Sequence, residues 1–232
     1  KEKFSGYCCD LWTDHAINFI KNSRKAPFFV YLATNTPHHP LTVDAKYTRP
    51  YQQLGLSEET SRYYGMITNF DENFGRLISV LKQEGLEKNT IVIFMGDNGT
   101  SSLHKQSDLY ETGLRGRKSY VYENGIRVPC CLSLPPITAG GKIDTICSVI
   151  DILPTLIDAC GLDLRQPVKF DGRSLLPLMK GSSDWPDRNL YFQWHRGNVP
   201  QKYRNMAVRN QRFKLVQPFG RDADDFTSAR FE

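Results

Sequence analysis

The sequence lacks a long apolar run and lacks closely spaced cysteine pairs. No stretch of its 232 residues approaches the roughly 20 consecutive apolar residues that a membrane-spanning helix needs, so no membrane span is expected. The six cysteines never occur as Cys-x-x-Cys, which argues against a zinc ribbon or a thioredoxin-type redox site. They are expected to be small buried residues. The first residues, 1–4, do not begin an apolar signal segment.

The positive charge is too small and too scattered to indicate a nucleic-acid surface. Thirty lysines and arginines stand against 25 aspartates and glutamates, a net charge of +5. A nucleic-acid-binding protein would be expected to show a basic stripe with interleaved aromatic residues, and no such stripe is present. A mild positive charge fits an anionic small-molecule substrate instead.

The order of the apolar segments predicts an α/β fold with a mostly parallel sheet flanked by helices. A buried strand is expected at 28–32, a long helix at 57–85 and a second buried strand at 90–96. A strand, a helix and a strand in this order are typical of parallel sheets with helical crossovers. Further helices are expected at 10–24 and 148–160, and a further strand at 126–134.

The pattern changes after Gly181. Three short apolar segments follow, 190–194, 206–209 and 212–216, with turns and no helix between them. This spacing favours a small antiparallel sheet. The predicted organisation is therefore an α/β domain over 1–180 and the start of a second, antiparallel domain over 181–232.

A carboxylate and an amide, Asp97 and Asn98, follow the strand at 90–96. The carboxyl ends of strands in α/β sheets are where ligands bind, and two hard oxygen donors suit Ca²⁺ or Mg²⁺ better than zinc. On spacing alone, an ordinary Asp-Asn-Gly turn explains the pair equally well.

Two other loops carry polar side chains of a complementary kind. His38 follows the strand expected at 28–32, so in a parallel sheet it would face the same crevice as Asp97. The segment 113–118, Gly-Leu-Arg-Gly-Arg-Lys, supplies Arg115 and Lys118 as cationic donors for an oxyanion. A histidine, a hard-metal pair and a lysine are the groups needed to transfer a phosphoryl or sulfuryl group.

The motifs taken together resemble the sulfatase (arylsulfatase) family. The matching segments occur in the family's order and at similar spacing: Thr36-Pro-His-His-Pro40, Ile93-Phe-Met-Gly-Asp-Asn-Gly99, Gly113-Leu-Arg-Gly-Arg-Lys118 and Tyr122-Glu-Asn-Gly-Ile-Arg-Val-Pro129. The resemblance covers nearly the whole chain. It implies an incomplete alkaline-phosphatase-like α/β fold with the start of a small C-terminal domain.

The resemblance also implies a calcium-dependent sulfuric ester hydrolase acting on a sulfated small molecule or saccharide. Asp97 and Asn98 would be two ligands of Ca²⁺, which is preferred here over Mg²⁺. His38 would help protonate the leaving-group oxygen, and Lys118 would bind a sulfate oxygen. A periplasmic, secreted or lysosomal location is the family's habit.

The chain departs from the family at the nucleophile. Sulfatases carry a Cys-x-Pro-x-Arg motif whose cysteine becomes formylglycine, together with an Asp-Asp pair that completes the metal site. Neither motif occurs in this sequence. The chain is therefore expected to be the middle and C-terminal part of a sulfatase, without turnover by itself.

The remaining candidates have supporting roles. Glu123 and Arg127 are expected to form an ion pair that, with Arg115, supports the loop carrying Lys118. His104 and His195 are candidates for substrate contact, against the alternative of ordinary surface histidines.

Two other functions stay open. One is a phosphodiester or phosphonate monoester hydrolase of the same superfamily. The other is a truncated, non-catalytic module that binds anions or calcium. The sequence does not indicate which sulfate ester would be the substrate.

Overall fold

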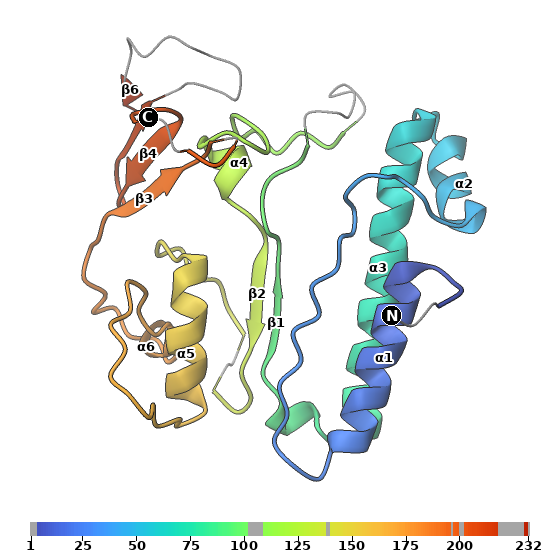
Figure 1. Cartoon of the computed structure of the whole chain (residues 1–232), viewed down its shortest axis with the longest axis horizontal. Coiled ribbons are helices and arrows are strands. Elements are labelled where there is room, and N and C mark those ends of the chain that lie inside the picture. Colours follow the sequence, from blue (N-terminus) through green and yellow to red (C-terminus); the bar gives the residue numbers. More distant parts are fainter. Residues whose placement is uncertain are drawn as a thin grey trace. The chain divides into compact units, whose positions relative to one another are not determined.

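The protein is described by a computed structural model that covers residues 4–101, 109–137, 140–195, 197–199 and 202–217, with the backbone of 230–231 (Figure 1). The chain divides into two compact units. Unit 1 comprises Lys1–Thr90 with Ser102–Glu111, and unit 2 comprises Ile91–Ser101 with Thr112–Glu232. The domain boundary expected near residue 180 is a different division and stays a prediction.

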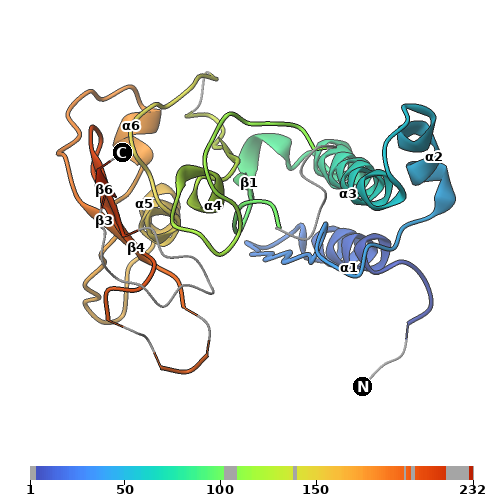
Figure 2. The same ribbon diagram turned by 90° about the horizontal axis from the view of Figure 1, so that it is seen from above.

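Unit 1 is built from helices. Its elements are α1 (Cys8–Ser23), α2 (Ala45–Gln53), α3 (Glu58–Gln83) and the short 3₁₀ helix η1 (Glu87–Asn89). Both α1 and α2 pack against α3, and Figure 2 shows α1 lying beside α3. The two helices expected at 10–24 and 57–85 are confirmed, whereas α2 was not predicted from the sequence.

The ends of α3 follow directly from its sequence. The hydroxyl of Ser57 accepts a hydrogen bond from the backbone N–H of Thr60 (3.3 Å), which satisfies one free donor at the start of the helix. Gly85 then adopts φ +70°, the left-handed conformation that ends many helices. Polar groups join the helices, because Asn69 and Asn73 on α3 both donate to Asp10 Oδ1 on α1 (2.8 and 2.7 Å).

The strand expected at 28–32 does not form. The segment is extended, but none of its residues is assigned to a strand, and every regular element described in unit 1 is helical. A strand needs a hydrogen-bonded neighbour, and unit 1 offers no described strand to pair with. Phe29 and Tyr31 are accordingly 73% and 83% exposed.

Unit 2 contains two antiparallel sheets. In the first, β1 (Val92–Met95) pairs with β2 (Cys130–Ser133), with Val92 opposite Ser133 and Met95 opposite Cys130. The strands expected at 90–96 and 126–134 are thus confirmed in shortened form, but β1 is only partly buried and not fully buried as expected. The prediction of a mostly parallel sheet is wrong for the described strands. β1 pairs antiparallel with β2 and not with the segment 28–32.

The second sheet has the order β3-β4-β5-β6 and is antiparallel throughout. Its strands are β3 (Leu190–Gln193), β4 (Met206–Arg209), β5 (Lys214–Gln217) and β6 (Arg230–Phe231). This confirms the small antiparallel sheet expected after Gly181. The hydrophobic cluster of this region consists of Val121, Tyr122, Ala207 and Val216, so the sheet packs on the loop that precedes α4 (Glu123–Ile126).

Between the two sheets the chain forms η3 (Val149–Asp151), which continues as α5 (Ile152–Ala159), and then α6 (Leu176–Met179). Ser148 and Asp151 form a reciprocal capping box at the start of this helix. The fully buried Asp151 also binds the guanidinium of Arg188 through both oxygens, which fixes the approach to β3.

Two further expectations concern a membrane-spanning helix and the burial of the cysteines. Among the described residues, no helix combines the length and apolarity required to cross a bilayer. The cysteines are all free thiols, but only Cys9 is buried. The other five are partly or largely exposed, so their expected role as buried packing residues is wrong.

Candidate functional site

The turn after β1 carries Asp97 and Asn98 and is held by backbone hydrogen bonds on both sides. Gly96 N–H donates to Pro129 O and Gly99 N–H donates to Gly125 O, each at 3.0 Å. Asn98 Nδ2 donates to Asp97 Oδ1 (2.8 Å), which sets the carboxylate and the amide side by side. Asp97 is exposed and Asn98 is partly buried. The pair therefore presents oxygen donors at the surface of unit 2.

The loop before α4 places Lys118 next to this turn. Lys118 N–H donates to Thr100 O (2.9 Å), so its backbone lies against the chain that leaves Asp97 and Asn98. Gly116 is required nearby, since it adopts φ +91° and a Cβ there would lie 2.6 Å from Tyr122 Cβ. The structure thus places the backbone of Lys118 beside the turn that carries Asp97 and Asn98, the two residues expected from the sequence to bind a metal.

Arginines of the same loop lie over tyrosine rings. The Arg115 guanidinium carbon lies 4.0 Å from the centre of the Tyr122 ring, and that of Arg117 lies 5.6 Å from the centre of the Tyr120 ring. Such cation–π contacts hold a guanidinium in place without neutralising its charge. They are consistent with the supporting role expected for Arg115 and leave positive charge around Lys118.

Glu123 is the centre of a network of charged residues. Its carboxylate accepts hydrogen bonds from Arg209 Nη1 (3.0 and 2.9 Å) and from Lys214 Nζ (3.0 Å), whereas Arg127 lies at 4.0 Å with a side chain that is 64% exposed. Burial by itself raises the pKa of Glu123, but the hydrogen bond and charge of Lys214, with Arg209 and Arg127, lower it below its ordinary value. The main partners are therefore in the C-terminal sheet, and Arg127 is peripheral.

His38 belongs to unit 1, on the loop before α2, and is exposed. Its Nδ1 lies 2.9 Å from His39 O. A carbonyl oxygen only accepts, so Nδ1 carries the proton and Nε2 is left available for proton exchange. The loop is tied down by His38 N–H, which donates to Asn35 O (2.7 Å), and by the Cys8 thiol, which donates to Asn35 Oδ1 (3.9 Å).

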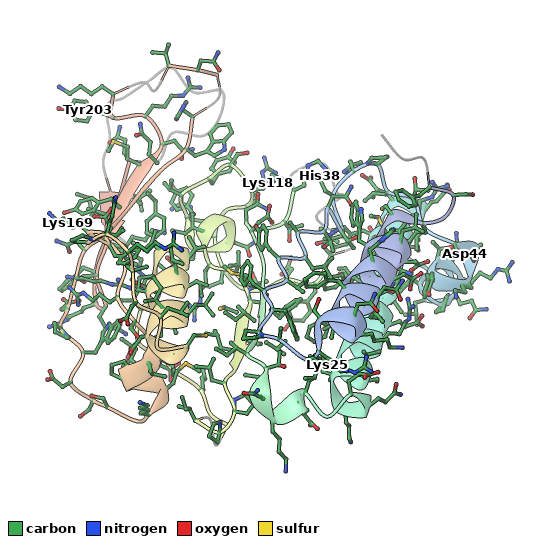
Figure 3. All side chains as sticks on the ribbon, turned by 60° about the horizontal axis from the view of Figure 1, so that its bottom comes forward. Lys25, His38, Asp44, Lys118, Lys169 and Tyr203 are labelled. Atoms are coloured by element: carbon green, nitrogen blue, oxygen red, sulfur yellow. The ribbon has the colours of Figure 1, made fainter. Side chains whose placement is uncertain are left out.

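The sequence-predicted residues are therefore distributed over both units. Asp97, Asn98, Arg115, Lys118, Glu123 and Arg127 lie in unit 2, and His38 lies in unit 1. Figure 3 labels Lys118 on its loop before α4 and His38 on its loop before α2. His195, partly buried, directly follows Trp194 at the end of β3, and its contact with substrate stays a prediction. His104 lies outside the described residues.

Asp97 and Asn98 fit a hard divalent cation in kind. Both offer oxygen donors, which Ca²⁺ prefers, but Ca²⁺ takes about six to eight oxygens and this pair provides two side chains. Within the part of the chain that the structure describes, no cluster of three or more His, Cys, Asp or Glu residues has the arrangement of a metal site. The pair by itself would supply only part of the ligands that Ca²⁺ requires.

Comparison with family models shows which protein family the chain belongs to. The model of the family described as sulfatase matches residues 2–162, more than half of the chain. The chain belongs to the sulfatase family. A second model, described as the C-terminal region of N-sulphoglucosamine sulphohydrolase, matches residues 113–227 and so includes both the Lys118 loop and most of the C-terminal sheet.

Individual sulfatases show the same relationship. The chain is 31% identical over 205 residues to an uncharacterized sulfatase, YdeN, of Escherichia coli, covering 84% of this chain and 36% of that protein. It is 29% identical over 204 residues to an endo-4-O-sulfatase of Bacteroides thetaiotaomicron, covering 76% and 39%. The chain thus spans well under half the length of these curated relatives.

A solved crystal structure matches the whole chain. The crystal structure of Ps i-CgsB in complex with k-i-k-neocarrahexaose superimposes with a TM-score of 0.83 at 26% identity. The match covers 100% of this chain and 49% of that one. A putative sulfatase, yidJ, from Bacteroides fragilis matches with a TM-score of 0.75 at 23% identity, which supports the alkaline-phosphatase-like fold.

Sequence reasoning missed the residues that support the Lys118 loop from the C-terminal sheet. These residues are Asn205, Arg209 and Lys214. One signal was available, since Lys214 and Val216 share a face of β5 by the two-residue alternation of a strand, and both are buried. A lysine on an apolar face needs a buried counter-charge, which Glu123 supplies. Asn205 offered no comparable signal.

Proposed function

We propose that this chain forms part of a sulfatase that hydrolyses a sulfate ester of a small molecule or a saccharide. The observation that carries the proposal is the backbone contact that places Lys118 against the chain leaving Asp97 and Asn98, in a member of the sulfatase family. The relative from B. thetaiotaomicron is named as an endo-4-O-sulfatase, and the matched crystal structure is a complex with k-i-k-neocarrahexaose. These names favour a sulfated saccharide.

Lys118 is proposed to bind a non-bridging oxygen of the sulfate. Its ammonium group would oppose the negative charge that develops as the S–O bond breaks, the kind of electrostatic stabilisation that contributes most in many enzymes. Arg115 and Arg117, held over tyrosine rings, add positive potential for an anionic substrate. Glu123 and Arg127 support this loop, and His104 and His195 remain candidates for contact with the rest of the substrate.

His38 is proposed to deliver a proton to the leaving-group oxygen. The bond from Nδ1–H to the His39 carbonyl fixes the tautomer and the ring orientation, so that protonated Nε2 is the group that donates.

Calcium is the proposed metal, with Asp97 and Asn98 as two of its ligands. When bound there, the cation would supply positive charge that draws the sulfate in and polarises it. The donor pair suits Mg²⁺ less well, because Mg²⁺ requires a stricter octahedral geometry.

The family's formylglycine nucleophile does not fit any residue of this chain. None of the six cysteines begins a Cys-x-Pro-x-Arg motif, so no nucleophilic step is assigned to them. We therefore propose that the 232-residue chain alone has no sulfatase turnover, and that residues 1–180 and 181–232 belong to the catalytic and C-terminal domains, respectively.

The test compares the 232-residue chain with the full open reading frame that encodes it, using a chromogenic aryl sulfate and calcium. Turnover is expected only from the full reading frame. Replacing Lys118 by Met there should lower kcat/KM by about a hundredfold or more, the usual effect of removing an oxyanion-stabilising group. Robust turnover by the short chain, or full activity of the Lys118→Met protein, would refute the proposal.

A phosphonate monoester hydrolase is the second candidate. Such an enzyme from Silicibacter pomeroyi matches the chain with a TM-score of 0.69 at 20% identity, which shows a shared fold. A phenyl phosphonate monoester, assayed beside the aryl sulfate, distinguishes the two reactions through the ratio of their kcat/KM values.

A further inference from the structure

The chain on the C-terminal side of Lys118 is attached to the C-terminal sheet by three different kinds of contact. They occur at Ser119, at Val121 with Tyr122, and at Glu123, all within five residues of the lysine. Lys118 itself donates its backbone N–H to Thr100 O, in the chain that follows β1. The lysine therefore lies between two fixed points.

The first contact is a hydrogen bond from Asn205. Its side-chain Nδ2 donates to Ser119 O (2.8 Å), and Asn205 itself is only 1% exposed. Ser119 has φ +76°, a left-handed conformation that non-glycine residues rarely adopt and that costs free energy unless the surroundings impose it. The bond from Asn205 acts on this residue, immediately after Lys118.

The second contact is apolar. Val121 and Tyr122 are 2% and 5% exposed and pack on Ala207 and Val216, which are 5% and 0% exposed. These residues come from the two central strands, β4 and β5. The loop thus shares the hydrophobic core of the sheet and does not lie loosely on its surface.

The third contact is ionic. Lys214 Nζ, on a side chain that is only 6% exposed, donates to Glu123 Oε1, and Arg209 Nη1 binds both carboxylate oxygens. Charged hydrogen bonds with this geometry fix position as well as contributing energy. Each of the three contacts joins residues that are more than 80 positions apart in the sequence.

We infer that Asn205 is a positioning residue for Lys118, and that the C-terminal sheet is a structural part of the anion site. This inference rests on the proposed function of Lys118. The bond to Ser119 O holds Ser119, the residue directly after Lys118, in its left-handed conformation. That conformation fixes the path of the chain next to Lys118, and so limits the positions from which the lysine side chain can extend.

The experiment follows Lys118 by NMR in the 232-residue chain, labelled with ¹³C at lysine Cε, during titration with sodium sulfate. Lys118→Met identifies the signal. In the unsubstituted chain the signal should shift on binding. In Asn205→Ala the starting signal should move or broaden, and the sulfate Kd should rise about tenfold, as expected from a small misplacement of a binding group.

Asn210→Ala is the matched control. Asn210 lies in the β4–β5 turn of the same sheet, where its Oδ1 accepts from Arg212 N–H (2.9 Å) and Phe213 N–H (2.7 Å). It should leave the Lys118 signal and the sulfate Kd within twofold of the parent's. If Asn205→Ala does not fold, Glu123→Gln provides the same test, because it weakens the ionic contact while keeping the shape of the side chain.

The two readouts separate the inference from the function on which it rests. An Asn205→Ala chain with a folded sheet, an unchanged Lys118 signal and an unchanged sulfate Kd overturns the inference and leaves the anion site standing. Absence of sulfate binding in the unsubstituted chain overturns the proposed anion site. In that case, a displaced Lys118 signal in Asn205→Ala still supports the positioning role.

Discussion

The loops that carry Lys118 and His38 are held in opposite ways. The Lys118 loop is attached to residues 86 to 91 positions away, through Asn205, Arg209 and Lys214. The His38 loop is held within unit 1 by its own backbone, by the Cys8 thiol, 27 positions from Asn35, and by the pair of His39 with Glu59 (3.6 Å) on α3. Lys118, the proposed anion-binding group, therefore depends on contacts between distant parts of unit 2, whereas His38, the proposed proton donor, depends on contacts in unit 1 that are closer in sequence.

The largest expected effect comes from closing the space inside the Lys118 loop. In Gly125→Ala, the new Cβ would lie 2.1 Å from Tyr120 O and 2.5 Å from Arg117 O, both of them backbone atoms. The loop cannot keep its path, so unit 2 should lose about 3 kcal/mol of stability or more. Urea unfolding followed by fluorescence measures this loss.

Gly113→Ala is the control for that substitution. Gly113 has φ +72° but nothing lies within 4 Å of the position of its Cβ. Its replacement should cost only about 1 kcal/mol, the price of a left-handed alanine. Equal losses for the two variants would contradict the tight packing of the loop.

The next effect tests the ionic contact. Glu123→Gln leaves the buried ammonium of Lys214 without a carboxylate partner and should cost about 2 kcal/mol, less than for a fully buried pair because the Glu123 side chain is 22% exposed. Glu58→Gln, which breaks an exposed pair with Arg62 on α3, should cost less than about 0.5 kcal/mol. Chemical denaturation of both variants gives the comparison.

Acid should weaken unit 2 through Glu123 and Asp151. Burial alone raises the pKa of Asp151, but Arg188 and the backbone N–H groups of Arg173 and Ser148 lower it, and the pKa of Glu123 is lowered as well. A carboxyl group whose pKa is lower in the folded than in the unfolded state stabilises the fold at pH values above the unfolded-state pKa. That stability is lost as the pH falls below about 4 and through the folded value.

The fluorescence of Trp185 and Trp194 in a Trp12→Phe chain reports on unit 2 alone. In that background, Glu123→Gln should flatten the decline of stability with acid. If stability declined with acid as steeply in Glu123→Gln as in the parent, Glu123 would not be bound by its partners as described.

Alkali should weaken unit 1 through Cys9. Burial raises the pKa of this thiol from 9.0 to about 11, and the neighbouring Thr36 hydroxyl offsets part of that rise. This stabilisation is fully present at pH values below the thiol pKa of the unfolded chain. It is lost as the pH rises towards 11. Burial also raises the pKa values of Cys130 and Cys147 in unit 2, so the fluorescence of Trp12, which lies in unit 1, is the signal to follow. Cys9→Ala should make the loss of stability of unit 1 at high pH less steep.

The smallest expected effect is in the His38 loop. Asn35→Ala removes the acceptor of a long bond from the Cys8 thiol, so unit 1 should lose less than about 1 kcal/mol. The NMR signal of the His38 ring should nevertheless move or broaden. A loss of several kcal/mol would show that this loop is as deeply anchored as the Lys118 loop.

Helices with clear periodicity and caps were predictable from the sequence, as α3 shows with Ser57 and Gly85 at its ends. The partners of the strands were not, because pairing depends on contacts far apart in sequence. Thus 28–32 reads as a buried strand but has no described partner in unit 1. The same limit applies to the site, where Lys118 was found from its loop motif but Asn205 was not.

The most direct test of the account is whether Lys118 and the pair Asp97–Asn98 form one site for an anion and a cation. Sulfate affinity of the 232-residue chain is measured by NMR with and without saturating calcium, together with the Asp97→Ala variant. The account predicts that calcium tightens sulfate binding, that sulfate tightens calcium binding by the same factor, and that Asp97→Ala abolishes this coupling. Sulfate affinity that is independent of both calcium and Asp97 would contradict it.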